Sequence, residues 1–271
     1  MRFQPPILLS LVISLSFSSC VFRPSIDDQG KVTVRPTHKM ILSLGTREFN
    51  KIKKSRQISH DPRYTDPVNR VAKRLQKAID IPEAEWEFVV FKDNSPNAFA
   101  LPGGKVGINT GLFRLADNDA LLAAALGHEI SHATGNHAKQ RTYRMIGLVL
   151  ASAILWQSLD HQDVDHAGYH AAALALAGYL IDSLPFSRKL EYESDRIGAV
   201  YMARAGYDPR QAIKLWRNME HYHALHGGQK NELLLTHPSD QSRIRALENF
   251  MPVAMKFYAE SQGKGKQHLK H

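Results

Sequence analysis

The chain has 271 residues, of which 43% are hydrophobic, and this is enough for one sizeable core with a small appendage. Its formal net charge is +9, but the cations are scattered and no DNA- or RNA-binding motif accompanies them, which argues against nucleic acid as a partner. The single cysteine, Cys20, excludes an intramolecular disulfide, so the core or a metal ion must hold the fold together.

The N-terminus has the pattern of an export signal. Arg2 precedes an apolar run, Ile7–Phe17, that is too short to span a bilayer. Small residues then lead to Cys20, as in the lipobox of bacterial lipoproteins. We therefore predict a signal peptide over residues 1–19, a lipid anchor at Cys20 and, because Val21 follows, the periplasmic side of the outer membrane. The alternative is an ordinary signal peptide and a soluble periplasmic or secreted protein.

The first half of the chain predicts a helix and three strands. Residues 20–60 are polar, and we expect them to form an irregular tether. Asp66 and Pro67 form a helix-start signal, and apolar residues at helical spacing continue to a stop at Pro82. Aromatic and β-branched residues then predict three strands, Trp86–Phe91, Ala98–Leu101 and Lys105–Asn109, the last two joined by the Pro102–Gly103–Gly104 turn.

The second half is helical. Asp117 or Asn118 can cap a helix that runs to His132, and five more helical segments follow at Met145–Leu159, Ala171–Leu184, Arg188–Ala205, Pro209–His223 and Ser239–Asn249. The first two of these are too short or interrupted for a membrane span, so we expect buried core helices or a hairpin. The sequence predicts an α+β fold, a small sheet on a mostly helical body, with a domain over residues 61–252 and a basic, disordered tail over residues 253–271.

The centre of the chain carries the run His128–Glu129–Ile130–Ser131–His132. On a helix, His128 and His132 lie one turn apart on one face, so both imidazoles can bind one metal ion. Glu129 lies about 100° around the helix and can reach a water next to that ion. Zinc with three protein ligands activates water near neutral pH, and Glu129 would act as general base and then protonate the leaving amine. The run predicts amide hydrolysis with one Zn²⁺ per chain.

Three candidates exist for the third ligand. The metzincin spacing is excluded, because Gly135 fits it but Ala138 stands where a histidine is required. The second is a polar cluster that suits an inter-helix loop better than a metal site, namely His161, Asp163, Asp165, His166 and His170. The third, Glu191, is favoured, because Asp195 lies one helical turn further on and can accept a hydrogen bond from a ligand histidine.

Together these segments resemble the HtpX and CAAX-prenyl-endopeptidase family of zinc metallopeptidases, most closely its exported LoiP- and BepA-type envelope proteases. The resemblance covers roughly Tyr64–Phe250. Its four matches, in family order and spacing, are Asn97–Gly104 with Thr110–Leu112, His128–His132, Glu191–Gly198, and Thr236–Pro238 followed by Arg243.

The resemblance implies a gluzincin-type domain and several roles. An edge strand would pair with extended polypeptide substrates, and its residues would be Lys105, Val106, Gly107, Ile108 and Asn109. His237 would lie near the zinc, either stabilising the oxyanion or blocking the site. The expected activity is an endopeptidase that degrades misfolded or unassembled cell-envelope proteins. The alternative is a latent or non-proteolytic assembly factor, and the sequence makes no prediction of oligomeric state.

Overall fold

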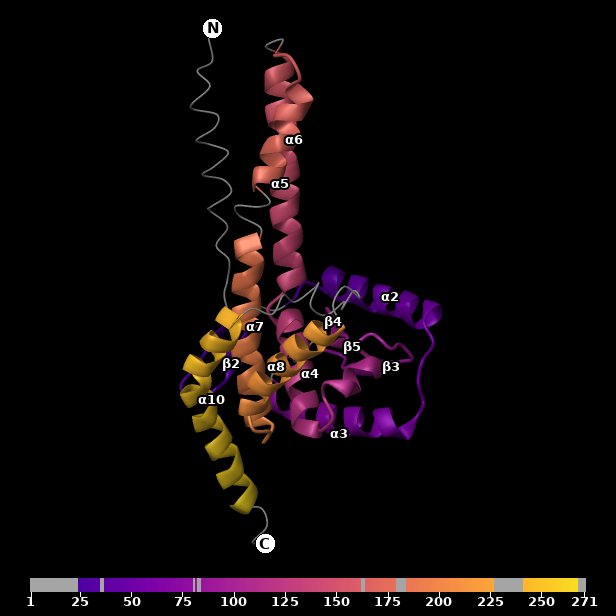
Figure 1. Ribbon diagram of the computed structural model, residues 1–271, viewed down its shortest axis with the longest axis vertical. Coiled ribbons are helices and arrows are strands. Elements are labelled where there is room, and N and C mark those ends of the chain that lie inside the picture. The colour runs from indigo at the N-terminus through magenta and orange to yellow at the C-terminus, as the bar shows by residue number, and fades with distance from the viewer. Residues whose placement is uncertain are drawn as a thin grey trace. The chain divides into compact units, whose positions relative to one another are not determined.

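The computed structural model describes residues 24–34, 37–79, 81, 84–161, 164–178, 184–226 and 241–267 of the chain (Figure 1). It contains two compact units. The larger comprises Pro24–Asn136 and Glu191–His271, and the smaller contains His137–Leu190. The α+β prediction is confirmed, because helices predominate and one small mixed sheet accompanies them. The predicted domain boundaries stay predictions.

The sheet lies in the larger unit and has the strand order β3–β5–β4. Strand β3 (Glu87–Phe91) runs parallel to β5 (Lys105–Asn109), and β4 (Ala98–Leu101) runs antiparallel to β5. The prediction that Lys105–Asn109 is an edge strand is therefore wrong, because β5 has a neighbour on each side. Among the described strands, β4 has a single neighbour and so forms an edge of the sheet.

The segment before the sheet is more ordered than the sequence suggested. A short hairpin pairs β1 (Ser25–Ile26) with β2 (Val32–Thr33), and α2 covers Lys39–Ser55. The expectation of an irregular tether is wrong here. The fully buried residues of α2 are Gly45 and Phe49. The Phe49 ring packs against those of Phe91 and Phe99, with centroid distances of 6.4 and 6.3 Å. Ile41 and Ile52 are partly buried on the same face as Gly45 and Phe49, so the spacing of these four residues was an available signal for a helix.

Helix α3 (Pro62–Ala78) begins earlier than predicted. The side chain of Asp61, not Asp66, caps it by accepting a hydrogen bond from the Arg63 N–H at 2.9 Å, and Pro67 lies inside the helix. The chain repeats the same Asp–Pro signal five residues apart, and the first copy is the one used. The apolar positions that carried the prediction, Val68, Val71 and Leu75 among them, are buried as expected.

The larger unit also contains one buried helix, α4 (Asp119–Thr134), which packs against α3, β4 and α8. The other elements of this unit are the 3₁₀ turn η1 (Thr110–Arg114), most of α7 (Leu184–Arg204), α8 (Arg210–Leu225) and α10 (Gln241–Gln267). The expectation of a disordered tail from residue 253 is wrong as far as Gln267. Ala254 and Phe257 lie after residue 253 and are buried, and their packing continues α10 past the predicted helix end at Asn249.

The smaller unit contains α5 (His137–Asp160) and α6 (Ala167–Gly178), which lie side by side as a hairpin (Figure 1). The hairpin prediction is confirmed, whereas the expectation of buried core helices is wrong for α5. Val149 and Trp156 are each more than half exposed. Within the described part of the chain, no helix combines the length and the hydropathy that crossing a membrane would require.

Candidate metal centre

Helix α4 carries the histidine pair, and its sequence explains why the pair is buried. The side chain of Asn118 caps the helix by accepting hydrogen bonds from the N–H groups of Ala120 and Leu121, both at 3.0 Å. Apolar residues from Leu121 onward bury the helix on all sides. His128, Glu129 and His132 are consequently buried as well, and buried polar groups of this kind require partners.

Helix α7 supplies those partners, because it contacts α4 at the level of the backbone. A Cβ atom added at Gly198 would lie 2.9 Å from the backbone nitrogen of His128, so only glycine permits this approach. Ser131 also links the helices, since its hydroxyl donates to the Ser194 carbonyl at 3.1 Å. This crossing brings the carboxylates of α7 to the imidazoles of α4. Gly198 was not predicted as a contact, although a glycine inside an otherwise apolar helix was the available signal.

The three predicted metal ligands converge. His128 Nε2 lies 3.1 Å from His132 Nε2 and 3.3 Å from Glu191 Oε2, and His132 Nε2 lies 3.5 Å from Glu191 Oε1. Donors bound at about 2.0–2.1 Å to a tetrahedral zinc lie roughly 3.4 Å apart, so the spacing fits that ion. Within the described residues, this is the only group of three or more His, Cys, Asp or Glu side chains close enough to hold a metal.

Asp195 lies behind the ligands, as its spacing from Glu191 predicted. Its Oδ1 is 3.0 Å from His128 Nδ1, the ring nitrogen that faces away from the ligand triangle. An Nδ1–H that donates to this carboxylate leaves Nε2 with a lone pair for a metal and fixes the ring orientation.

Arg243 of α10 connects the two carboxylates of α7. Its Nε and Nη2 donate to Asp195 Oδ2 and Oδ1 at 2.9 and 2.7 Å, and its Nη1 lies 3.3 Å from Glu191 Oε2. Arg243 is 1% exposed, and its guanidinium lies 4.0 Å from the centroid of the Trp216 ring. The Trp216 and His128 rings are in T-shaped contact with their centroids 5.0 Å apart. The sequence analysis named Arg243 only as part of a resemblance and missed Trp216.

The carboxylates determine the protonation state of His128 in the metal-free protein. Burial alone lowers the pKa of this imidazole, but hydrogen bonds to Asp195 and Glu191 outweigh burial and raise the pKa to about 9. Burial raises the pKa of Asp195, yet the positive charges of Arg243 and His128 dominate and hold it below its usual range. Asp195 is therefore ionised at neutral pH, and a metal ion must displace a proton from His128.

All five residues of the predicted substrate strand, Lys105–Asn109, are buried. Lys105 and Asn109 have structural partners, since the Lys105 ammonium donates to the Glu85 carbonyl at 2.8 Å and Asn109 accepts from Arg56 at the same distance. Both side chains are buried, Lys105 against the segment before β3 and Asn109 against Arg56 at the end of α2. His237 and Cys20 lie outside the described residues, and so does Asp163.

Comparisons with known proteins agree with this geometry. The profile of peptidase family M48 matches residues 62–251. Mitochondrial metalloendopeptidase OMA1 of Schizosaccharomyces pombe is 37% identical over 190 residues, which cover 69% of this chain and 53% of that protein. The beta-barrel assembly-enhancing protease of Escherichia coli K12 is 30% identical over 214 residues, which cover 77% of this chain and 43% of that protein.

A third relative, mitochondrial metalloendopeptidase OMA1 of Danio rerio, is 34% identical over 210 residues, which cover 74% of this chain and 43% of that protein. The chain thus spans about half the length or less of these curated relatives. The matched region contains the His128, His132 and Glu191 group, and the predicted resemblance is confirmed at the level of the family. The chain belongs to peptidase family M48.

Proposed function

We propose that this chain is a zinc-dependent endopeptidase that hydrolyses peptide bonds of misfolded or unassembled cell-envelope proteins. The observation that carries the proposal is the convergence of His128, His132 and Glu191 at distances that suit tetrahedral zinc. Zinc would be held by His128 Nε2, His132 Nε2 and the Glu191 carboxylate. When bound there, zinc supplies a Lewis acid that activates water and polarises a carbonyl near neutral pH.

The side chains around the ligands would perform the proton transfers and the positioning. Glu129 follows His128 on α4 and is buried beside it, so it can take a proton from the attacking water and deliver it to the leaving amine. Asp195 holds His128 in the tautomer that the site needs, and Arg243 holds Asp195 through two hydrogen bonds.

Substrate would pair with the edge strand β4 in place of β5. Helix α4 packs against β4, so this edge lies beside the element that carries the histidines. The Asn109 N–H donates to the Asn97 carbonyl at 2.9 Å, and alternation along an antiparallel pair then directs the backbone groups of Ala98 and Ala100 away from β5. Main-chain pairing at such an edge binds extended peptides with little dependence on their sequence.

The proposed substrate class rests on the export signal and on one relative. Residues 1–19 have the composition of a signal peptide, and the Escherichia coli relative is named as a protease that enhances beta-barrel assembly. The OMA1 relatives are named as mitochondrial, so the cell-envelope location is part of the proposal, as is the lipid anchor at Cys20.

The test is cleavage of unfolded casein by the full chain with zinc, with a chelator, and with the variant Glu129→Gln. We expect cleavage to need zinc and to fall by at least about a hundredfold in the variant, because general bases contribute roughly 10²–10⁴ in rate. Glu260→Gln is a matched control on the exposed surface of α10 and should cleave normally.

The variant His237→Ala separates latency from inactivity. If the wild type binds one zinc without cleaving and His237→Ala cleaves, the enzyme is latent and His237 blocks it. If neither protein cleaves casein while both hold zinc, the endopeptidase proposal fails and the assembly-factor alternative replaces it.

A further inference from the structure

Helix α2 has an exposed stripe, which we call the α2 stripe, formed by Met40, Leu44, Arg47, Lys51 and Lys54. These residues recur at intervals of four and three, so they lie on one face of the helix. Met40 is 62% exposed and Leu44 is 50% exposed, and the three cations that follow are exposed as well. The stripe therefore has an aliphatic end and a cationic end.

The opposite face of α2 holds the helix firmly on the sheet. Phe49 is fully buried among aromatic rings of β3 and β4. A Cβ atom added at Gly45 would lie 2.2 Å from the Pro102 carbonyl oxygen, so the helix backbone touches the turn that follows β4. The α2 stripe is thus presented by a rigid element, and ordering the helix would cost nothing on binding a partner.

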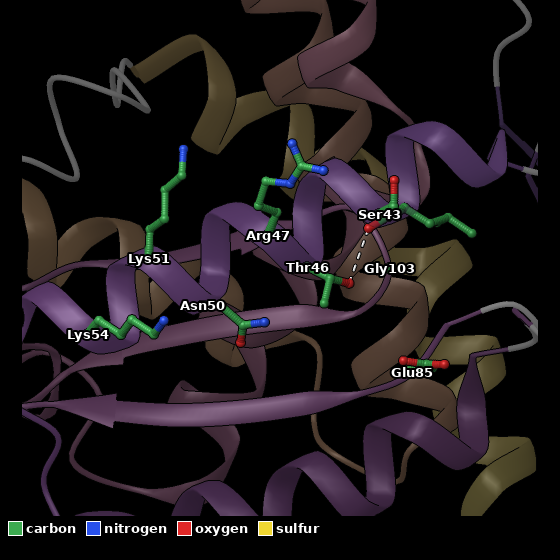
Figure 2. A pocket seen from close by; sticks show the side chains of 9 residues that line it. Ser43, Thr46, Arg47, Asn50, Lys51, Lys54, Glu85 and Gly103 are labelled. Atoms are coloured by element: carbon green, nitrogen blue, oxygen red, sulfur yellow. Dashed lines mark hydrogen bonds between the residues drawn. The ribbon is translucent and has the colours of Figure 1, made fainter.

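A groove of about 570 Å³ runs along the cationic end of the stripe (Figure 2). Arg47 and Lys51 project from the same side of α2, and the hydroxyl and amide groups of Ser43, Thr46 and Asn50 also line the groove. The Ser43 and Thr46 hydroxyls donate to carbonyls of their own helix, at Met40 and Leu42. The cationic side chains and the Asn50 amide are therefore the donors that suit phosphate oxygens.

The charge of the groove is predominantly positive. The Lys51 ammonium lies 3.1 Å from Glu48, and Glu85 contributes one carboxylate to the lining. Among the described residues, neither Arg47 nor Lys54 has an ion-pair partner. Their charge is therefore available to an anionic surface.

We propose that the α2 stripe docks on an anionic phospholipid surface, with Met40 and Leu44 entering the acyl boundary and the groove receiving headgroup phosphates. Aliphatic side chains next to cations on one helix face match the composition of an interfacial helix. A nucleic acid would offer the cations the same phosphates but would leave Met40 and Leu44 exposed to water. Docking of this kind requires neither proteolysis nor lipidation of Cys20.

The test measures binding of the full chain to phosphatidylcholine vesicles with and without about 30% phosphatidylglycerol, at about 0.1 M salt. Every protein carries Cys20→Ser so that no acyl chain contributes. The readout is the ratio of the two partition coefficients, which isolates the contribution of anionic lipid. The triple variant Arg47→Gln, Lys51→Gln, Lys54→Gln should lower this ratio on the order of 100-fold, because each cation near an anionic surface contributes roughly fivefold.

The matched control is Lys73→Gln, Lys214→Gln, Arg245→Gln, which removes the same charge from exposed positions on α3, α8 and α10. Its ratio should change by less than about threefold. A second variant, Met40→Ser with Leu44→Ser, keeps every charge and should weaken binding to the anionic vesicles roughly tenfold, because two half-exposed aliphatic side chains no longer enter the lipid.

Three results would overturn the proposal. The wild type could show no preference for phosphatidylglycerol. The two triple variants could lose binding equally, which would indicate a general effect of net charge. Duplex DNA or inorganic phosphate could displace the protein from anionic vesicles at matched ionic strength, which would indicate a soluble phosphate ligand. Thermal unfolding of each variant within a few degrees of the wild type ensures that lost binding is not lost folding.

Discussion

Removal of Arg243 should destabilise the metal-free protein far more than removal of an exposed arginine. In Arg243→Ala, the carboxylates of Asp195 and Glu191 stay buried but lose one of the cations that contact both of them, leaving protonated His128. Breaking a buried ion pair in this way costs about 3–5 kcal/mol, and the lost stacking on Trp216 increases the cost. A typical domain unfolds with about 5–15 kcal/mol, so the metal-free variant should be close to unfolding.

Zinc should recover a large part of this loss, because a divalent cation at the ligand triangle opposes the charge of Glu191 that Arg243 no longer balances. The assay is urea unfolding with excess chelator and again with zinc, followed by far-ultraviolet circular dichroism. The difference between the zinc-loaded and metal-free unfolding free energies should be larger in the variant than in the wild type.

The matched control is Arg217→Ala. Arg217 pairs with Glu248 at 2.7 Å, but the two side chains are 62% and 40% exposed, and such surface pairs contribute at most about 1 kcal/mol. If Arg243→Ala cost no more than this control in the metal-free protein, or lost the same free energy with and without zinc, the electrostatic account of Arg243 would be refuted.

Three further predictions follow from the site. The raised pKa of His128, about 9, keeps the imidazole protonated in the metal-free protein, so zinc uptake at pH 7 should release about one proton from it. That release should fall to about half near pH 9 and vanish at higher pH; calorimetry in buffers of different ionisation enthalpy measures it. Gly198→Ala should weaken zinc binding and cost about 1–3 kcal/mol, because its methyl group would force α7 away from the His128 backbone; unchanged affinity in a chelator competition would argue against this contact. Ala100→Pro removes an N–H from the outer edge of β4, so it should lower kcat/KM for peptides on the order of tenfold with little change in Tm. The control Ala100→Val keeps the N–H and should cleave peptides normally.

The grouping of metal-site side chains could be predicted because it depends on short-range periodicity. His128 and His132 share a face of α4 by their spacing alone, and Glu191 and Asp195 share a face of α7 for the same reason. Coordination chemistry then requires a third ligand, and Glu191 was the candidate with a supporting residue nearby. The structure brings these four side chains together.

The contacts that the sequence did not reveal depend on chain segments far apart. The strand order β3–β5–β4 places the later strand of a hairpin in the middle, and nothing local in Lys105–Asn109 distinguishes a central strand from an edge strand of five residues. Arg243 lies on the buried face of α10, one turn before Leu247. Helical periodicity therefore indicates a charged residue at a buried position, but it does not predict which carboxylates that residue contacts.

Helix α2 carried a local signal that was not used to predict it. It rests on the sheet through Gly45 and Phe49, with Ile41 and Ile52 partly buried on the same face. These four positions recur at intervals of four, four and three, which is a helical apolar period. The packing of Phe49 on aromatic rings and the close contact at Gly45 depend on distant segments and could not be predicted from this period.

The most direct test of the central claim is a crystal structure of the purified full chain with anomalous diffraction recorded on both sides of the zinc absorption edge. The account predicts one zinc per chain, bound by His128 Nε2, His132 Nε2 and a Glu191 carboxylate oxygen at about 2.0–2.2 Å, with Asp195 still hydrogen-bonded to His128 Nδ1. A chain that holds no zinc after incubation with excess metal, or a zinc bound without Glu191, would contradict it.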